Sequence, residues 1–172
     1  MSHPQIAHYL PADPVTVQCT FFEKSSQRNW LVPVHQDLSI AVQSRSDAPG
    51  YSAWSTKEAM VFVQPPLAVL QSLVAVRLHL DPCGPEDGPL HVIAGTHRRG
   101  LIVPAEAARL RQETSTEICA VAAGAAMVMK PLLLHASSKA SGKSRRRVLH
   151  FVFGPKDLPS GVHWHAAVAP TP

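Results

Sequence analysis

The sequence predicts a mainly β fold, an antiparallel sandwich or barrel of short strands with few helices. Sixteen prolines among 172 residues disfavour long helices and mark many turns. Between these turns lie seven or eight short runs rich in β-branched and aromatic residues, which is the pattern of an all-β domain. Hydrophobic residues make up 45% of the chain and charged residues 16%, which is typical of a globular protein with a packed core.

The first half of the chain contains an apolar region with one unusual polar motif. Residues 15–22 are β-rich and predict the first strand, followed by a polar loop over 23–29. Residues 30–42 predict a second strand region, and it contains the sequence Pro-Val-His-Gln-Asp-Leu. A polar loop over 43–53 and a short strand over 60–63 are expected next.

The second half continues the same alternation and adds one convincing helix. That helix is expected over 104–113, with proline in its first turn followed by Ala-Glu-Ala-Ala-Arg-Leu-Arg. No repeat or composition break divides the chain, so a single domain over 1–172 is expected, ending in a proline-rich irregular tail over 155–172. Strands are expected over residues 73–81, 90–93, 118–121, 126–137 and 146–153.

Composition argues against several classes of function. The net charge is only +4, and no basic stripe with interleaved aromatic residues occurs, so a nucleic-acid partner is not expected. Cys19, Cys83 and Cys119 are odd in number and far apart, which predicts neither a disulfide framework nor a zinc ribbon. Neither a signal peptide nor a bilayer-spanning apolar run is visible, so we expect a cytoplasmic protein without a membrane partner.

His35 and Asp37 are the first candidate site residues. Residues two apart on a β-strand point to the same face, so both side chains would enter one space. A buried carboxylate without a positive partner costs several kcal/mol. A metal ion between the two side chains is one solution, and a hydrogen-bonded histidine–aspartate pair at a strand edge is the alternative.

A third ligand would complete a 2-His-1-carboxylate triad, which suits non-haem Fe(II) oxygenases. His135 is the preferred candidate because it ends a strongly apolar segment, where a side chain can be buried on one side and open to substrate on the other. The sequence alone leaves other histidines available for this role: His79, His91, His97, His150, His163 and His165.

Arg146 follows early in the next expected strand, which as an antiparallel neighbour would bring it beside the metal-binding strand. Alternation along the strand places Arg146 on the face of His150, and Arg147 on the opposite face. The planar arginine fork suits a carboxylate. Arg77 and His79 share a face of the 73–81 strand, where they either line a substrate mouth or form a salt-bridged inner face.

Together these motifs resemble the phytanoyl-CoA dioxygenase family of Fe(II)/2-oxoglutarate oxygenases. The resemblance extends over residues 21–153 and implies the family's double-stranded β-helix, a cupin-like jelly roll of two sheets, which agrees with the expected strand count. It rests on the segments FFEKSSQRNWLVPVHQDL, HLDPCGPEDGPLHVIAGTHRRG, PLLLHASS and RRRVLHF.

The resemblance implies roles for individual residues. His35, Asp37 and His135 would ligate Fe(II), while 2-oxoglutarate would bind the same ion and extend its far carboxylate to Arg146 and Ser137. Lys24 is a weaker candidate for contact with this co-substrate.

The implied reaction consumes O2 and 2-oxoglutarate, releases succinate and CO2, and hydroxylates a small organic substrate, with ascorbate as an activator. Asp37 indicates a hydroxylase, because halogenating relatives lack this carboxylate and bind chloride in its place. Two alternatives stay open: a cupin-like metalloenzyme that does not use 2-oxoglutarate, and a catalytically silent jelly-roll binding protein.

Overall fold

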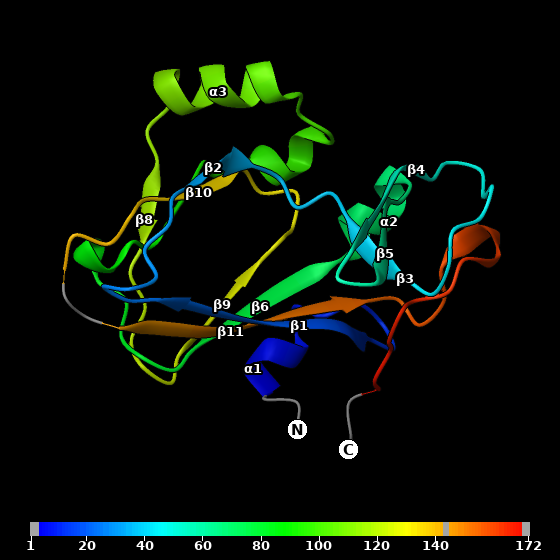
Figure 1. Ribbon diagram of the computed structural model, residues 1–172, viewed down its shortest axis with the longest axis horizontal. Coiled ribbons are helices and arrows are strands. Elements are labelled where there is room, and N and C mark those ends of the chain that lie inside the picture. Colours follow the sequence, from blue (N-terminus) through cyan, green and yellow to red (C-terminus); the bar gives the residue numbers. More distant parts are fainter. Residues whose placement is uncertain (1–3, 143–144, 170–172) are drawn as a thin grey trace.

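Two antiparallel sheets face each other in the computed structural model, which describes residues 4–142 and 145–169 (Figure 1). The larger sheet has the order β1-β11-β6-β9 and the smaller sheet the order β2-β10-β7-β8, which confirms the predicted mainly β jelly roll. Their strands are β1 Val15–Lys24, β11 Arg146–Gly154, β6 Val74–His79, β9 Ala126–Met129, β2 Val32–His35, β10 His135–Ser137, β7 Leu90–Val92 and β8 Glu117–Cys119.

A third sheet, of three strands, closes one end of the molecule (Figure 1). It has the order β3-β5-β4, formed by Ile40–Val42, Met60–Gln64 and Ser52–Lys57. Its buried side chains belong to the largest apolar cluster, which also contains Leu70, Leu132 and Trp164. Leu38, in the segment between β2 and β3, packs against this core just after the His-Gln-Asp motif.

The described residues form three α-helices. They are α1 Pro4–Ala7, α2 Leu67–Ser72 and α3 Pro104–Glu113, and α3 crosses the outer side of the smaller sheet (Figure 1). Short 3-10 turns occupy Pro85–Asp87, Thr96–Arg99 and Pro159–Gly161. Across the described ranges, every helix is too short or too polar to cross a lipid bilayer.

Two strand regions expected to be continuous are each broken in the structure. The region 30–42 divides into β2 and β3, and the region 126–137 divides into β9 and β10. A turn closed by the bond from Leu133 N–H to the Lys130 carbonyl ends β9 and redirects the chain from the larger to the smaller sheet. His135 therefore begins a strand, where the sequence predicted that it ends one.

Other elements compare more simply with the expectations. The helix over 104–113 is confirmed at both ends, whereas α2 and β4 were not predicted. The polar loop expected from residue 23 begins two residues later, because β1 continues through Lys24. The tail was predicted to be irregular, yet Trp164 packs in the core and Val168 pairs with Thr16, while its last residues, 170–172, lie outside the described part.

Candidate metal centre

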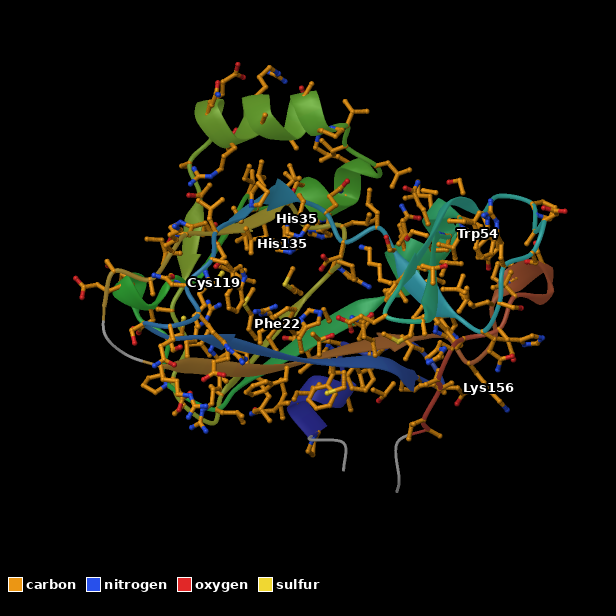
Figure 2. All side chains as sticks on the ribbon, in the orientation of Figure 1. Phe22, His35, Trp54, Cys119, His135 and Lys156 are labelled. Atoms are coloured by element: carbon orange, nitrogen blue, oxygen red, sulfur yellow. The ribbon has the colours of Figure 1, made fainter. Side chains whose placement is uncertain are left out.

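His35, Asp37 and His135 meet on the inner side of the smaller sheet, as Figure 2 shows for the two histidines. One ligand-type atom from each residue lies within 4.8 Å of the other two. Nε2 of His35 is 3.3 Å from Oδ1 of Asp37, and Nε2 of His135 is 3.7 Å from Oδ2 of the same carboxylate. Spacings of this size fit three donors arranged around one ion at bond lengths of about 2.1 Å.

A backbone carbonyl fixes the orientation of each imidazole. Nδ1 of His35 lies 2.9 Å from the Pro33 carbonyl oxygen, and Nδ1 of His135 lies 2.8 Å from that of Leu133. A carbonyl oxygen can only accept, so each Nδ1 carries the proton and each Nε2 presents its lone pair to the shared space. Hydrogen bonds of this kind orient metal-ligating histidines.

The charge states of the triad suit cation binding. Burial acts to raise the pKa of Asp37, but its hydrogen bond to His35 and the charges of both histidines lower that pKa overall. Burial lowers the pKa of His135, so this imidazole is neutral at pH 7. The Asp37 carboxylate, as the acceptor of a hydrogen bond from His35, raises the pKa of His35. The site thus offers one carboxylate and two imidazoles as ligands. A cation can bind a neutral imidazole as it stands and can displace the proton of a charged one.

Asp37 lies just beyond β2, so the predicted strand alternation does not place it. Its backbone N–H donates to the Pro131 carbonyl at 2.9 Å, which ties the motif to the turn before β10. Gln36 fixes the other side of the same segment: its amide donates to the carbonyls of Gly100 and Leu132 and accepts from Ile102 N–H.

The role of Gln36 was missed by the sequence reasoning. The sequence did contain a signal: Gln36 lies between two residues expected to point inward, so its side chain should emerge on the opposite face of an apolar segment. Buried at 7% exposure, its side chain locks the ligand loop to two other loops.

A cavity of about 410 Å³ opens between the two sheets in front of the triad. His135 is almost fully buried at its wall, while the side chains of His35 and Asp37 are 37% and 39% exposed. Phe22 projects from β1 into the interior opposite the two histidines (Figure 2). The cavity therefore gives a small molecule access to the triad from one side.

Arg146 and Ser137 line the same cavity, as the sequence predicted for their side chains. Arg146 shares the inner face of β11 with Val148 and His150, while Arg147 pairs with Asp81 on the other face, which confirms the predicted alternation. One expectation was wrong: β11 pairs with β1 and β6, so it is not a neighbour of β10. Arg146 instead faces the strand of His135 from the opposite sheet.

Gly88 joins these residues into one network. Its carbonyl oxygen accepts hydrogen bonds from the Ser137 hydroxyl at 2.9 Å and from the Arg146 guanidinium. Gly88 has φ +63°, and a Cβ there would lie 2.6 Å from the Ser138 carbonyl oxygen, so only glycine fits without a backbone shift. The sequence reasoning treated this glycine only as part of a turn.

Lys24 lies behind this network and is 1% exposed. Its ammonium group donates to Ser137 Oγ at 2.6 Å and to the Ser138 carbonyl, and it lies 5.6 Å from the centre of the Trp30 ring. Burial, followed by the charge of Arg146, lowers the pKa of Lys24 to about 8. Lys24 does not itself line the cavity, so it acts on the cavity through Ser137 and through its charge.

The other histidines and Arg77 occupy distinct positions. Arg77 and His150 line the cavity, and no ion pair is formed by Arg77 within the described ranges, so the salt-bridged alternative is wrong. His79 is buried outside the cavity lining. In the turn that contains His97, the Thr96 hydroxyl donates to the Ile93 carbonyl and accepts from Leu134 N–H.

Residues 5–148 match the sequence model of the phytanoyl-CoA dioxygenase family, a span that contains the triad and Arg146. The chain belongs to the phytanoyl-CoA dioxygenase family. A search of curated proteins finds no match.

Solved structures share the jelly roll of this family member at low sequence identity. EvdMO1 is 19% identical with a TM-score of 0.63, and the match covers 90% of this chain and 31% of EvdMO1. The non-haem monooxygenase ThoJ, in a nickel complex, is 17% identical with a TM-score of 0.61, covering 98% and 58% of the two chains. HygX from Streptomyces hygroscopicus, with nickel and 2-oxoglutarate bound, is 14% identical with a TM-score of 0.57, covering 91% and 62%. The present chain thus spans less than two thirds of each of these proteins.

The residues of this phytanoyl-CoA dioxygenase family member fit the groups that the fold implies. Two imidazoles and one carboxylate with an open side form the donor set of non-haem Fe(II) sites. Nε of Arg146 is buried and has no hydrogen-bond partner among the described residues, so this guanidinium retains a donor for a further acceptor. Lys24 adds positive charge behind it, which suits a carboxylate-bearing co-substrate.

Proposed function

We propose that this chain is an Fe(II)- and 2-oxoglutarate-dependent dioxygenase that hydroxylates a small organic substrate. One observation carries the proposal: the His-Asp-His triad and Ser137, on the side of the smaller sheet, face one cavity with Arg146 from the larger sheet. Family membership adds support, since the family is defined by dioxygenase chemistry. The proposed reaction consumes O2 and 2-oxoglutarate and releases succinate and CO2.

His35, Asp37 and His135 would hold the metal. Their carbonyl-anchored rings and the Asp37 N–H bond to Pro131 keep the donors in place before the ion binds, which reduces the ordering cost of binding. Asp37 supplies the only carboxylate of the triad and balances half of the charge of Fe(II). When bound, Fe(II) supplies O2 activation coupled to oxidation of 2-oxoglutarate.

Arg146 and Ser137 would bind the far carboxylate of 2-oxoglutarate. A buried guanidinium in a cavity makes short, charge-assisted hydrogen bonds to a carboxylate. The Gly88 carbonyl accepts from the Arg146 guanidinium and from the Ser137 hydroxyl, whose oxygen accepts from the Lys24 ammonium. To bind the carboxylate, the Ser137 hydroxyl would turn its one hydrogen from Gly88 to the co-substrate. The co-substrate would therefore be held at one end of the cavity, with its chelating end toward the triad.

The presence of Asp37 favours hydroxylation over halogenation. A carboxylate at this position occupies the place that a halide ion takes in halogenating relatives, and the histidines complete the remaining protein ligands. Apolar and aromatic residues around the triad, such as Phe22, Trp30 and Leu38, would limit the access of water to the reacting atoms.

The test is uncoupled turnover. Purified protein receives Fe(II), 2-oxoglutarate, ascorbate and O2 without a primary substrate, and succinate is quantified against time. The proposal expects slow succinate formation that stops without Fe(II) and falls to background in His135→Ala. Arg147→Ala, whose side chain pairs with Asp81 on the outer face, is the matched control and should retain wild-type rates.

Two results would favour the alternatives. Tight metal binding without any 2-oxoglutarate consumption supports a cupin-like metalloenzyme that does not use this co-substrate. Failure to bind either metal or 2-oxoglutarate supports a silent jelly-roll binding protein. Metabolite screening, with stimulation of succinate output as the readout, then identifies the primary substrate.

A further inference from the structure

Arg77 is a second buried arginine in the cavity, and the reaction described above assigns it no role. It lies in the middle of β6, is 7% exposed and lines the same cavity as the triad. Among the described residues, its one hydrogen bond runs from a terminal nitrogen to Nδ1 of His150 at 3.0 Å. Its Nε is buried and has no partner within the described part of the chain. A guanidinium carries five N–H donors, so most of its hydrogen-bonding capacity is unused.

Neighbouring strands hold the Arg77 guanidinium in place. Arg77 and His150 are directly paired between β6 and β11. Phe22, from β1, lies under the guanidinium at 5.4 Å from its ring centre and contacts the His150 ring edge-to-face at 5.7 Å. The Arg77 guanidinium, stacked on an aromatic ring and anchored by one hydrogen bond, is therefore ordered before any ligand binds.

The charge balance of the cavity leaves Arg77 without a counter-ion. The charged side chains that line the cavity are Asp37, Lys57, Arg77 and Arg146. In the proposed reaction, the charges of Fe(II) and Arg146 together balance Asp37 and the two carboxylates of 2-oxoglutarate. Lys57 is exposed to solvent, and the buried Lys24 lies outside the cavity lining, where Ser137 Oγ and the Ser138 carbonyl accept from its ammonium group. Among the cations that line the cavity, Arg77 is therefore the buried one that stays unbalanced. Burying an unpaired charge is costly, which indicates that an anion joins it in the working complex.

Arg77 is anchored away from the end of the cavity where Arg146 lies. It pairs with His150, four residues along β11 from Arg146, so the two anchor points are separated by about 13 Å along the strand. The two guanidinium groups also have separate partners, because Arg77 donates to His150 and Arg146 donates to the Gly88 carbonyl.

His150 is suited to support this role. Burial, followed by the charge of Arg77, lowers the pKa of His150 to about 4, so its ring is neutral at pH 7 and accepts from the guanidinium. Burial and the charge of Arg146 lower the pKa of Arg77 to about 10, which still leaves it cationic at pH 7.

We infer that Arg77, supported by Phe22 and His150, binds an anionic group of the primary substrate, so the substrate is a carboxylate- or phosphate-bearing molecule. The inference rests on the proposed function, because it takes the site at Arg146 to be occupied by 2-oxoglutarate. The exposed Lys57 at the cavity wall adds attraction for an anion that enters from solvent.

The experiment measures binding without turnover. Protein loaded with Ni(II) and saturated with 2-oxoglutarate is titrated by calorimetry with hexanoate, hexyl phosphate and the neutral hexanamide. Saturation with 2-oxoglutarate keeps the probes away from Arg146. Wild type should bind at least one of the two anions at least tenfold more tightly than the amide, and the stronger anion distinguishes a carboxylate from a phosphate substrate.

Two variants and one control assign the preference to Arg77. Arg77→Met should remove the anion preference while its affinity for 2-oxoglutarate stays within twofold of wild type. Arg77→Lys keeps the charge without the fork and should keep a reduced preference, which also serves if the methionine variant does not fold. Arg147→Ala should behave as wild type, since it changes a cation on the outer face.

The possible failures are distinguishable. If wild type loaded with Ni(II) does not bind 2-oxoglutarate, the proposed function itself is contradicted. If 2-oxoglutarate binds normally but no anion preference exists, or if Arg77→Met retains the preference, only the inference on Arg77 is overturned. A tenfold or larger loss of 2-oxoglutarate affinity in Arg77→Met would instead assign Arg77 to the co-substrate and also overturn it.

Discussion

His35 and His135 lie directly opposite each other on the antiparallel strands β2 and β10, with ring centres 4.3 Å apart. Directly opposed residues on neighbouring strands project to the same face, so pairing of the two strands alone brings both imidazoles to one point. Each ring donates Nδ1–H to the carbonyl of the residue two positions earlier. The same local hydrogen bond, from ring to backbone carbonyl, thus orients both histidines, and Asp37 completes the triad from the loop after β2.

Asp37 should be essential for metal binding. Asp37→Ala removes the only carboxylate of the triad, so Fe(II) affinity should fall by at least a hundredfold, and succinate output should fall with it. Asp37→Glu should retain part of the metal but lower turnover more than binding, because the longer side chain shifts the open positions. Metal content after dialysis, measured for both variants, checks this prediction. Full iron content in Asp37→Ala would show that the carboxylate is not a ligand.

Arg146 should control co-substrate affinity, and Arg147 should not. Arg146→Ala should weaken 2-oxoglutarate binding by about 2–5 kcal/mol, the range for losing one partner of a buried charge pair. Arg147→Ala breaks a partly exposed pair with Asp81 and should change the binding by less than about 0.5 kcal/mol. Calorimetric titration of each Ni(II)-loaded variant with 2-oxoglutarate gives the comparison. The reverse ranking would contradict the assignment of faces on β11.

Lys24 should make co-substrate binding depend on pH. Burial and Arg146 lower the pKa of Lys24 to about 8 in the free protein, so its ammonium group loses its proton as the pH rises from 7 to 9. A bound dianion favours the charged form, so 2-oxoglutarate affinity should be greatest below pH 8 and fall by up to about tenfold by pH 9. Lys24→Met should bind more weakly at pH 7 and lose this dependence. An unchanged pH profile in Lys24→Met would exclude Lys24 as its source.

Gln36 should contribute to stability without acting on the reaction. Its side chain satisfies two carbonyls and one N–H in two other loops. Gln36→Leu leaves these groups unpaired and should lower the free energy of unfolding by about 2–4 kcal/mol. Chemical denaturation of the metal-free protein measures this loss. A change below about 0.5 kcal/mol would show that water replaces the three bonds at little cost.

Much of the fold was readable because it depends on local patterns. The helix over 104–113 has its proline at the start and no competing strand signal, and the alternation along β11 follows directly from a strand period of two. The order of strands was not readable, because it depends on contacts between distant segments. For that reason Arg146 was expected on the strand next to β10 and lies on the opposite sheet.

The site was readable in its residues but not in its geometry. The spacing of His35 and Asp37 indicated a shared space, yet the strand ends at His35, and Asp37 is turned inward by bonds to the loop at Pro131. The support from Gln36 and the close fit of Gly88 depend on loops that meet only in three dimensions. The lack of a counter-ion for Arg77 likewise becomes visible only when the cavity is assembled.

Anaerobic titration with 2-oxoglutarate tests the central claim most directly. A 2-oxo acid that chelates Fe(II) held by two histidines and a carboxylate gives a visible charge-transfer absorption, and no substrate or turnover is needed. The account predicts this absorption for wild type and Arg147→Ala, its loss in His135→Ala, and its appearance only at much higher 2-oxoglutarate concentration in Arg146→Ala. Iron-loaded wild type that shows no such absorption at saturating 2-oxoglutarate, or His135→Ala that shows it undiminished, would contradict the account.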